Sequence, residues 1–215
     1  NALSTKLSVE VYKDGQIYSQ SYKIGKPDEP VKVIGKCSAE KHGTKVTFHP
    51  DPTIFEETVY DYDTLKQRLR ETAFLTKGLR IVLSDARVDP VHTHEFHYAG
   101  GIKEFVTYLN KSKEALYPEV IYCEGTRDGV YVEVAMQHND SYNDATYSFV
   151  NNIITPEGGT HLAGFRNAMT KTFNAYAKAN KILKDNEPPL TGDDIREGLT
   201  AIISIKIEEP QFEGQ

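Results

Sequence analysis

The sequence predicts an α+β fold, in which strands and helices follow one another without strict alternation. Its second half carries this prediction, because three extended runs precede one long helical segment and a final extended run. Two Asp-Gly pairs, Asp14-Gly15 and Asp128-Gly129, each lie between extended runs, which is the strongest short-range signal for an antiparallel hairpin. Hairpins and one long helix together favour this class over a strictly alternating α/β fold.

Length, charge and cysteine content exclude several classes of protein. A chain of 215 residues buries enough surface to fold without disulfide bridges or structural metal ions. Its 25 Lys and Arg against 31 Asp and Glu give a formal net charge of −6, which disfavours wrapping of nucleic acid by bulk charge but allows a local basic patch. Cys37 and Cys123 make neither a disulfide framework nor a zinc site. Without a membrane span or signal peptide, we expect a soluble, cytoplasmic protein with no membrane partner.

The first hundred residues carry short extended runs and one amphipathic helix. Leu65, Leu69 and Ala73 recur at i, i+4 and i+8 behind a cap at Asp63 or Thr64, which predicts the helix. Strands are expected at 7–11, 17–22, 31–34, 45–48 and 79–83. Residues 86–98 are polar and predicted to be irregular. They lead to Gly100-Gly101, where we place the boundary between two domains, 1–100 and 101–215.

Past this boundary the pattern predicts two helices and a set of strands. Apolar residues recur at i, i+3, i+4 and i+7 from Ile102, which predicts the first helix. Strands are expected at 120–124, 130–136, 145–149 and 201–207, and a short helical turn from Thr191 or Asp193. A long helix is predicted from Thr160 to Ala179. Its expected apolar face comprises Phe165, Ala168, Met169, Thr172 and Tyr176, and its other side carries Arg166, Lys171 and Lys178.

Two motifs have the residue types of a ligand site but lack the spacing. His92, His94 and His97 are close enough to suggest a metal cluster, but their spacing fits no zinc template, and His97 would leave the face that His92 and His94 share in a strand. Gly158-Gly159 before the long helix could present amides to an anion, but no lysine follows as in a Walker loop. We therefore predict no metal site, and the residues by themselves indicate no catalytic centre.

Five longer runs are far more specific than these motifs. They are FHYAGG at 96–101, YSFVNNI at 147–153, GGTHLAGFR at 158–166, TGDDIREGLTA at 191–201 and PQFEGQ at 210–215. Together they resemble the gyrase B family, the ATPase subunits of bacterial type II DNA topoisomerases, and the resemblance runs over essentially the whole chain.

The resemblance implies a more detailed architecture. Residues 1–100 would be the C-terminal portion of a GHKL ATPase sandwich, and 101–215 a transducer domain with a left-handed βαβ crossover. The family's catalytic glutamate, adenine-binding aspartate and ATP lid would precede residue 1, and the chain would stop just before the switch lysine. The absence of a methionine at Asn1 and the abrupt end at Gln215 fit the expectation that the chain is cut from a longer one.

The same resemblance implies a function and its partners. The intact protein would couple the binding and hydrolysis of ATP with Mg²⁺ to DNA strand passage and negative supercoiling. It would act on double-stranded DNA in an A2B2 heterotetramer with the gyrase A protein, and its N-terminal domains would form a homodimer on ATP binding. Since the general base lies outside this chain, no catalytic residue is expected within it, and the chain alone should be inactive and bind no nucleotide tightly. The corresponding ATPase protein of topoisomerase IV, a decatenating enzyme, and a non-enzymatic binding module remain alternatives.

The resemblance carries nucleotide contacts onto four positions. Gly43-Thr44 matches a glycine–threonine motif whose hydroxyl joins a network of water and aspartate at the adenine. Gln215 matches a glutamine that, with the missing lysine, reaches the γ-phosphate. Lys13 stands where many members have an arginine at the edge of the nucleotide and coumarin pocket, and it lacks the bidentate fork of arginine.

The resemblance also implies DNA contacts and a hinge. Arg166 matches an arginine that lines the cavity into which the transported DNA segment passes, and Lys171 and Lys178 are expected to share its face of the helix. Mechanical coupling would depend on Gln215 and on a hinge near Gly100-Gly101.

Overall fold

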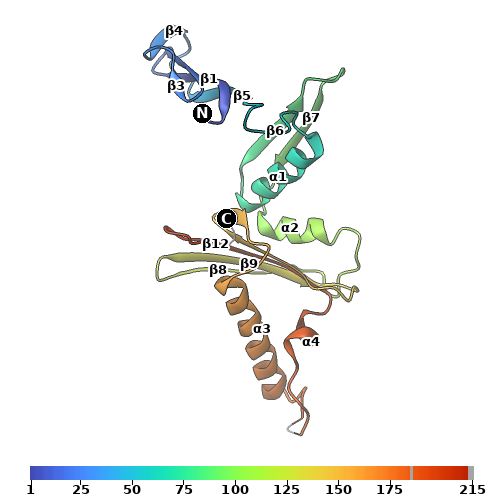
Figure 1. The fold of residues 1–215 in the computed structure, drawn as a ribbon. Coiled ribbons are helices and arrows are strands. Elements are labelled where there is room, and N and C mark those ends of the chain that lie inside the picture. Colours follow the sequence, from blue (N-terminus) through green and yellow to red (C-terminus); the bar gives the residue numbers. More distant parts are fainter. Residues whose placement is uncertain (185, 213–215) are drawn as a thin grey trace. The chain divides into compact units, whose positions relative to one another are not determined.

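The computed structural model describes residues 1–184 and 186–212 of the chain. They fall into two compact units, Asn1–Asp61 and Tyr62–Gln215. Figure 1 shows a small unit built of strands and a larger unit in which helices and strands are combined. The predicted α+β class is therefore confirmed.

The first unit is one antiparallel sheet of five strands. They are β1 (Ser4–Lys13), β2 (Gln16–Lys23), β3 (Lys26–Pro27), β4 (Lys32–Lys36) and β5 (Gly43–Pro50), in the order β3-β2-β1-β5 with β4 also on β2. The predicted hairpin is confirmed, because Asp14 and Gly15 both have positive φ, 53° and 75°, between the paired residues Lys13 and Gln16. This backbone matches the twist of the two strands that it joins.

The second unit begins with a helix and a two-stranded hairpin. Helix α1 (Tyr62–Leu75) is followed by β6 (Arg80–Asp85), β7 (His92–His97) and α2 (Ile102–Leu109). The expectation of irregular structure throughout 86–98 is wrong for β7, which pairs antiparallel with β6. Phe96 decides this pairing, since it lies opposite Ile81 and is fully buried. Histidine and glutamate hide the alternation there, because neither is a typical strand residue.

A mixed five-stranded sheet forms the centre of this unit. Its strands are β8 (Ile121–Arg127), β9 (Val130–His138), β10 (Ala145–Val150), β11 (Ile153–Ile154) and β12 (Leu199–Lys206), in the order β11-β10-β12-β9-β8. Strand β12 is antiparallel to β9 and parallel to β10. The connection between the parallel strands runs through α3 (Thr160–Ala179) and α4 (Gly192–Arg196). The second predicted hairpin is also confirmed, with φ of 50° at Asp128 and 79° at Gly129.

Helices cover both faces of this sheet, and Figure 1 shows α2 and α3 on opposite sides of it. On one face Ile202 packs in a cluster with Phe74 of α1 and Phe105 of α2. On the other face Ile203 packs in a cluster with Met169 of α3 and Ile195 of α4. Successive side chains of a strand point to opposite faces, so β12 supplies residues to both cores and reads as a nearly continuous apolar run.

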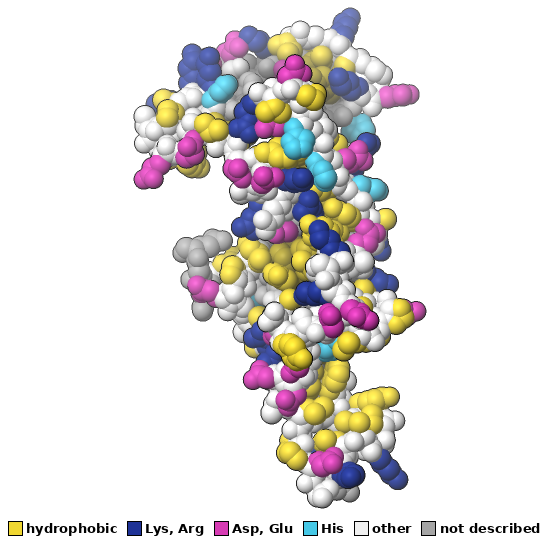
Figure 2. Space-filling model, turned by 90° about the vertical axis from the view of Figure 1, so that its right-hand side faces the viewer, with side chains coloured by type: hydrophobic (Ala, Val, Ile, Leu, Met, Phe, Trp, Pro, Cys, Tyr) yellow, Lys and Arg dark blue, Asp and Glu magenta, His cyan; other side chains and the backbone are white. Residues whose placement is uncertain are grey.

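The apolar face expected for α3 needs correction. Met169 and Ala177 are buried, but Ala168 and Thr172 are exposed. Leu162 and Phe165 join Met169 against the sheet, so the stripe follows residues three and four apart from Leu162. In Figure 1 the helix runs away from the sheet, and near its C-terminal end Tyr176 and Ile182 are 63% and 68% exposed. Figure 2 shows hydrophobic side chains at that lower end of the molecule.

Gly198 sits where α4 ends and β12 begins, with a φ of 69°. A Cβ at this position would overlap the carbonyl oxygen of Asn139 and lie 2.6 Å from that of Ser141. We expect Gly198→Ala to lower the free energy of unfolding by about 2–4 kcal/mol, because alanine would be strained in this backbone conformation and its Cβ would collide with the two carbonyl oxygens. Urea unfolding of the 215-residue chain measures this.

The matched control is Gly164→Ala in α3, where a Cβ would meet nothing within 4 Å. Alanine favours helix over glycine by up to about 1 kcal/mol, so this variant should be neutral or more stable. Equal destabilisation by both substitutions would contradict the proposed steric origin.

Candidate functional site

Gly43 and Thr44 open the edge strand β5 of the first unit and are exposed. Gly43 has a φ of 141°, which disfavours any other residue, although the space around it is open. Thr44 pairs with Val11 of β1. Because side chains alternate along a strand, the Thr44 hydroxyl shares its face with Val46, which is 53% exposed. This face therefore presents one hydroxyl beside exposed apolar side chains.

The opposite face of the same strands carries a polar network. The Tyr12 hydroxyl donates to Glu10 Oε2 at 2.9 Å, and the ammonium of Lys41 lies 4.0 Å from the centre of the Tyr12 ring. Lys45 Nζ lies 3.5 Å from Glu10 Oε1. The bond from Tyr12, followed by the charge of Lys45, lowers the pKa of Glu10, and the same bond raises the pKa of Tyr12. Lys13, at the end of β1, is exposed and lies two residues from Val11, on the Thr44 face of the sheet.

Arg166 belongs to an ion cluster at one end of the parallel strands β10 and β12. Its Nη2 donates to Asp144 Oδ2 at 3.2 Å, and Nε of Arg196 donates to the same oxygen at 3.1 Å. The other Asp144 oxygen accepts from the Thr146 hydroxyl, and Arg196 Nη2 lies 2.6 Å from Asp193 Oδ1. Two guanidinium groups thus share one carboxylate oxygen. Arg166 is 42% exposed, while its buried Nε has no hydrogen-bond partner among the described residues.

The two lysines proposed to act with Arg166 lie on a different side of α3. Lys171 and Lys178 are both exposed and are seven residues apart, which places them on one face of a helix with 3.6 residues per turn. Arg166 is about 140° around the helix from Lys171. The helix therefore presents a pair of lysines and a separate arginine rather than one patch of three cations.

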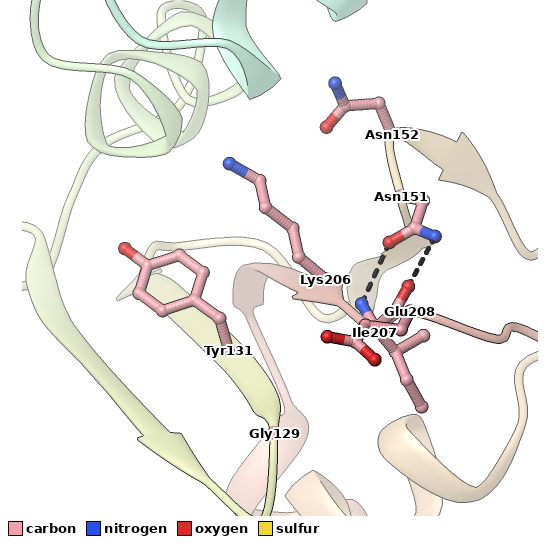
Figure 3. A pocket seen from close by; sticks show the side chains of 7 residues that line it. All are labelled: Gly129, Tyr131, Asn151, Asn152, Lys206, Ile207 and Glu208. Atoms are coloured by element: carbon pink, nitrogen blue, oxygen red, sulfur yellow. Dashed lines mark hydrogen bonds between the residues drawn. The ribbon is translucent and has the colours of Figure 1, made fainter.

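Gln215 lies outside the described residues, but the segment that leads to it can be followed to Phe212. Strand β12 ends at Lys206, and Asn151 then holds the next residue, Ile207. Asn151 Nδ2 donates to the Ile207 carbonyl at 2.9 Å, and the Ile207 amide donates to Asn151 Oδ1 at 3.0 Å, as Figure 3 shows. The Lys206 ammonium lies 5.6 Å from the centre of the Tyr131 ring. Gly129, Asn152 and Glu208 complete a shallow pocket of about 480 Å³ there.

Two tyrosines and two glutamates form a polar cluster on β8 and β9 beside this pocket. Glu124 and Glu133 are directly paired across the strands. Tyr122 donates toward both carboxylates, at 2.7 and 2.9 Å, and Tyr131 donates to Glu124 at 2.6 Å. The bond to Glu124 raises the pKa of Tyr131 to about 12, and the bonds from Tyr131 and then Tyr122 lower the pKa of Glu124. Hydroxyl donors thereby offset the repulsion of two like charges.

The remaining motifs have structural roles. Thr191 caps α4 in a reciprocal capping box with Asp194, which accounts for part of the TGDDIREG run.

His92 stacks on Tyr62 at 4.5 Å, and burial lowers the pKa of His94. Among the described residues, no three His, Cys, Asp or Glu side chains are grouped so as to hold a metal ion. No helix in the described ranges is long and apolar enough to cross a membrane.

Sequence patterns missed three residues at these sites, Asp144, Arg196 and Asn151. Asp144 lies 22 residues from Arg166 and 52 from Arg196, so no local spacing relates them. Asn151 left a signal, since an Asn-Asn pair between two extended runs is typical of left-handed turn conformation. Its φ is indeed 49°, and that of Asn152 is 66°.

We expect Asp144→Asn to lower the free energy of unfolding by about 1–2 kcal/mol, because two partly buried guanidinium groups lose their shared counter-charge. The matched control is Asp193→Asn, whose side chain is 95% exposed and pairs with Arg196 alone among the described residues. It should change stability by no more than about 0.5 kcal/mol. Urea unfolding compares the two variants, and equal effects would show that Asp144 holds no such cluster together.

Comparison with known proteins identifies the family. The sequence model described as DNA gyrase B matches residues 101–215. The DNA gyrase B protein of Clostridium acetobutylicum is 56% identical over the whole of this chain, which spans 33% of that protein, and that of Bacillus mycoides is 50% identical, with 53% of its length covered. The chain thus spans between a third and about half the length of these curated relatives.

Solved structures agree in fold. The 43K ATPase domain of Thermus thermophilus gyrase B, in complex with an aminocoumarin, is 38% identical and superimposes with a TM-score of 0.86 over 99% of this chain and 58% of its own. The ATP-binding domain of Francisella tularensis topoisomerase IV is 27% identical, with a TM-score of 0.79 over 100% of this chain and 57% of its own. The chain belongs to the DNA gyrase B family.

Proposed function

We propose that this chain is the part of a gyrase B protein that transmits the state of bound ATP to the DNA path. One observation carries the proposal: the parallel strands β10 and β12 have a predicted site at each of their ends. Asp144, which binds Arg166, lies just before β10, and Arg196, which binds the same Asp144 oxygen, lies just before β12. Asn151 and Ile207 follow the two strands on the way to Gln215. An eight-residue strand spans about 26 Å, so a rigid sheet can connect two distant contacts.

The proposed mechanism depends on differential affinity. In the intact protein, ATP supplies a γ-phosphate that ADP lacks, and Gln215 would contact it while Thr44 contacts the adenine. A ligand shifts a conformational equilibrium only as far as it binds one state better, so a contact made to the γ-phosphate alone distinguishes ATP from ADP. The β12 strand would carry that difference to the end of the sheet that holds Arg166.

The family model begins at residue 101, which supports a division into part of a GHKL ATPase domain, 1–100, and a transducer domain with a left-handed crossover, 101–215. The proposed boundary falls inside the second compact unit, where Phe74 of α1 stacks on Phe105 of α2 at 4.7 Å. Helix α1 and its hairpin would therefore move together with the transducer sheet, which disfavours the expected hinge near Gly100-Gly101. Gly101, with a φ of 61°, would be the point between them where the backbone turns.

Gyrase is favoured over topoisomerase IV, because the curated relatives at 50–56% identity over this chain are gyrase B proteins. The whole protein would then act in the cytoplasm with Mg²⁺ and ATP, in an A2B2 complex with the gyrase A protein, and introduce negative supercoils into double-stranded DNA. Its N-terminal domains would dimerise when ATP binds. A decatenase built on the same fold is the alternative, supported by the likeness to the topoisomerase IV structure.

We expect the isolated 215-residue chain to hydrolyse no ATP, because the catalytic glutamate and the lid of the family would lie outside it. A coupled ATPase assay, together with calorimetric titration of a non-hydrolysable ATP analogue, measures this. Turnover that survives further purification, or saturable binding of the analogue at micromolar concentration, would contradict the assignment of the missing parts.

In the full-length protein reconstituted with gyrase A, Arg166→Ala should reduce the DNA stimulation of ATPase activity by roughly tenfold, as expected for one lost charge-assisted contact. Affinity for the ATP analogue should stay unchanged. Arg127→Ala is the control, since the side chain of this last residue of β8 is 94% exposed. Equal DNA stimulation in wild type and Arg166→Ala would remove Arg166 from the DNA path.

A further inference from the structure

We infer that Asn151 is a positioning residue that sets the direction in which the chain leaves β12 toward Gln215, and so controls discrimination between ATP and ADP. The inference rests on the proposed function for the contact of Gln215. The hydrogen bonds between the Asn151 side chain and Ile207 carry it.

The neighbouring strand cannot hold Ile207 by itself. β10 pairs with β12 in parallel as far as Val150 opposite Ile205. The chain then turns through Asn151 and Asn152, both with positive φ, and returns as β11 along the outer edge of β10. Ile207 therefore lies beyond the last backbone pair of the ladder.

The side chain of Asn151 forms the hydrogen bonds to Ile207 that a further paired residue of β10 would have formed. Its amide group binds both the N–H and the C=O of Ile207, and its own backbone N–H donates to the Ile205 carbonyl at 2.9 Å. Asn151 thus binds two residues at the end of β12, Ile205 through its backbone and Ile207 through its side chain. On the other side of β12, Lys206 pairs with Tyr131 of β9, so the end of the strand is held from both neighbours.

The short distance along the chain from Ile207 to Gln215 makes these hydrogen bonds of Asn151, the Asn151 clamp, important. Seven residues lie between Ile207 and Gln215, and the eight steps from one to the other span at most about 28 Å when fully extended. With so short a connection, the direction in which the chain leaves β12 would limit the positions that Gln215 can reach, and hence its effective concentration at the γ-phosphate. Losing the clamp would lower that concentration without touching the nucleotide.

Asn151→Gly is the variant that tests this in the full-length protein. Glycine accepts a φ of 49° without strain, so the substitution removes the amide and leaves the turn conformation accessible. Asn152→Gly is the matched control, because Asn152 occupies the same turn with a φ of 66° but its side chain donates to Thr76 Oγ1 instead. Asn151→Asp is a second variant that keeps the acceptor for the Ile207 N–H and loses the donor.

The measurement is the Kd of a non-hydrolysable ATP analogue and of ADP for each variant, by calorimetry. Asn151→Gly should weaken the analogue by roughly five- to tenfold and leave ADP unchanged, the size expected when about two modest hydrogen bonds are lost. Asn151→Asp should shift the analogue in the same direction, and Asn152→Gly should shift neither nucleotide. Equal weakening of both nucleotides, or the same effect from Asn152→Gly, would mean a merely structural role and would overturn the inference.

Gln215→Ala distinguishes a failure of the role of Asn151 from a failure of the proposed γ-phosphate contact. If Asn151 acts through Gln215, the double variant should bind the analogue as weakly as Gln215→Ala alone, and additive losses would overturn the inference. If Gln215→Ala weakens the analogue but Asn151→Gly does not, the inference fails and the proposed γ-phosphate contact stands. If Gln215→Ala has no effect, that contact fails, and the inference fails with it.

Discussion

The burial of β12 on both faces is the constraint on which the larger unit depends. Thr200, Ile202 and Ser204 point to one face, and Ala201 and Ile203 to the other, and all five are nearly inaccessible. A slip of one residue in register would exchange the two sets between cores of different shape, so the pairing with β9 and β10 is strongly specified. Helices α1 and α2 pack in one of the two clusters that this strand joins, and α3 and α4 in the other.

A buried polar network fixes the start of β12 against α2 and β9. The hydroxyl of Thr200 donates to Asn110 Oδ1 at 2.7 Å and accepts from Asn139 Nδ2 at 3.1 Å, and Asn110 Nδ2 reaches Gln137 Oε1 at 3.0 Å. Such networks rigidify a core when their members are paired. His138 adds a link to α4, because its Nε2 donates to the Ile195 carbonyl at 2.9 Å. These paired groups therefore rigidify the end of the sheet near Arg196.

Electrostatics at the two ends of the parallel strands differ in kind. Near Arg166 the charges are paired through one shared carboxylate, so a cation is held in place and remains 42% exposed. Near Ile207 the contact is made by the neutral side-chain amide of Asn151. The carboxylates of the neighbouring cluster accept hydrogen bonds from tyrosine hydroxyls. Salt has little effect on the hydrogen bonds of the neutral Asn151 amide. The charge interactions of the exposed Arg166 would instead weaken as ionic strength rises, as contacts to phosphate do.

The sequence by itself determined the elements whose causes are local. Asp-Gly at 14–15 and 128–129 specified both hairpins through the positive φ that they tolerate, and the apolar spacing from Ile102 and the run from Thr160 to Ala179 specified α2 and α3. The five long motifs were sufficient to predict the family. Only the tertiary structure decided the residues that act at a distance. Asp144 meets Arg196 across 52 residues and Asn151 meets Ile207 across 56, because the parallel pairing of β10 and β12 brings their ends together and no local pattern encodes that pairing.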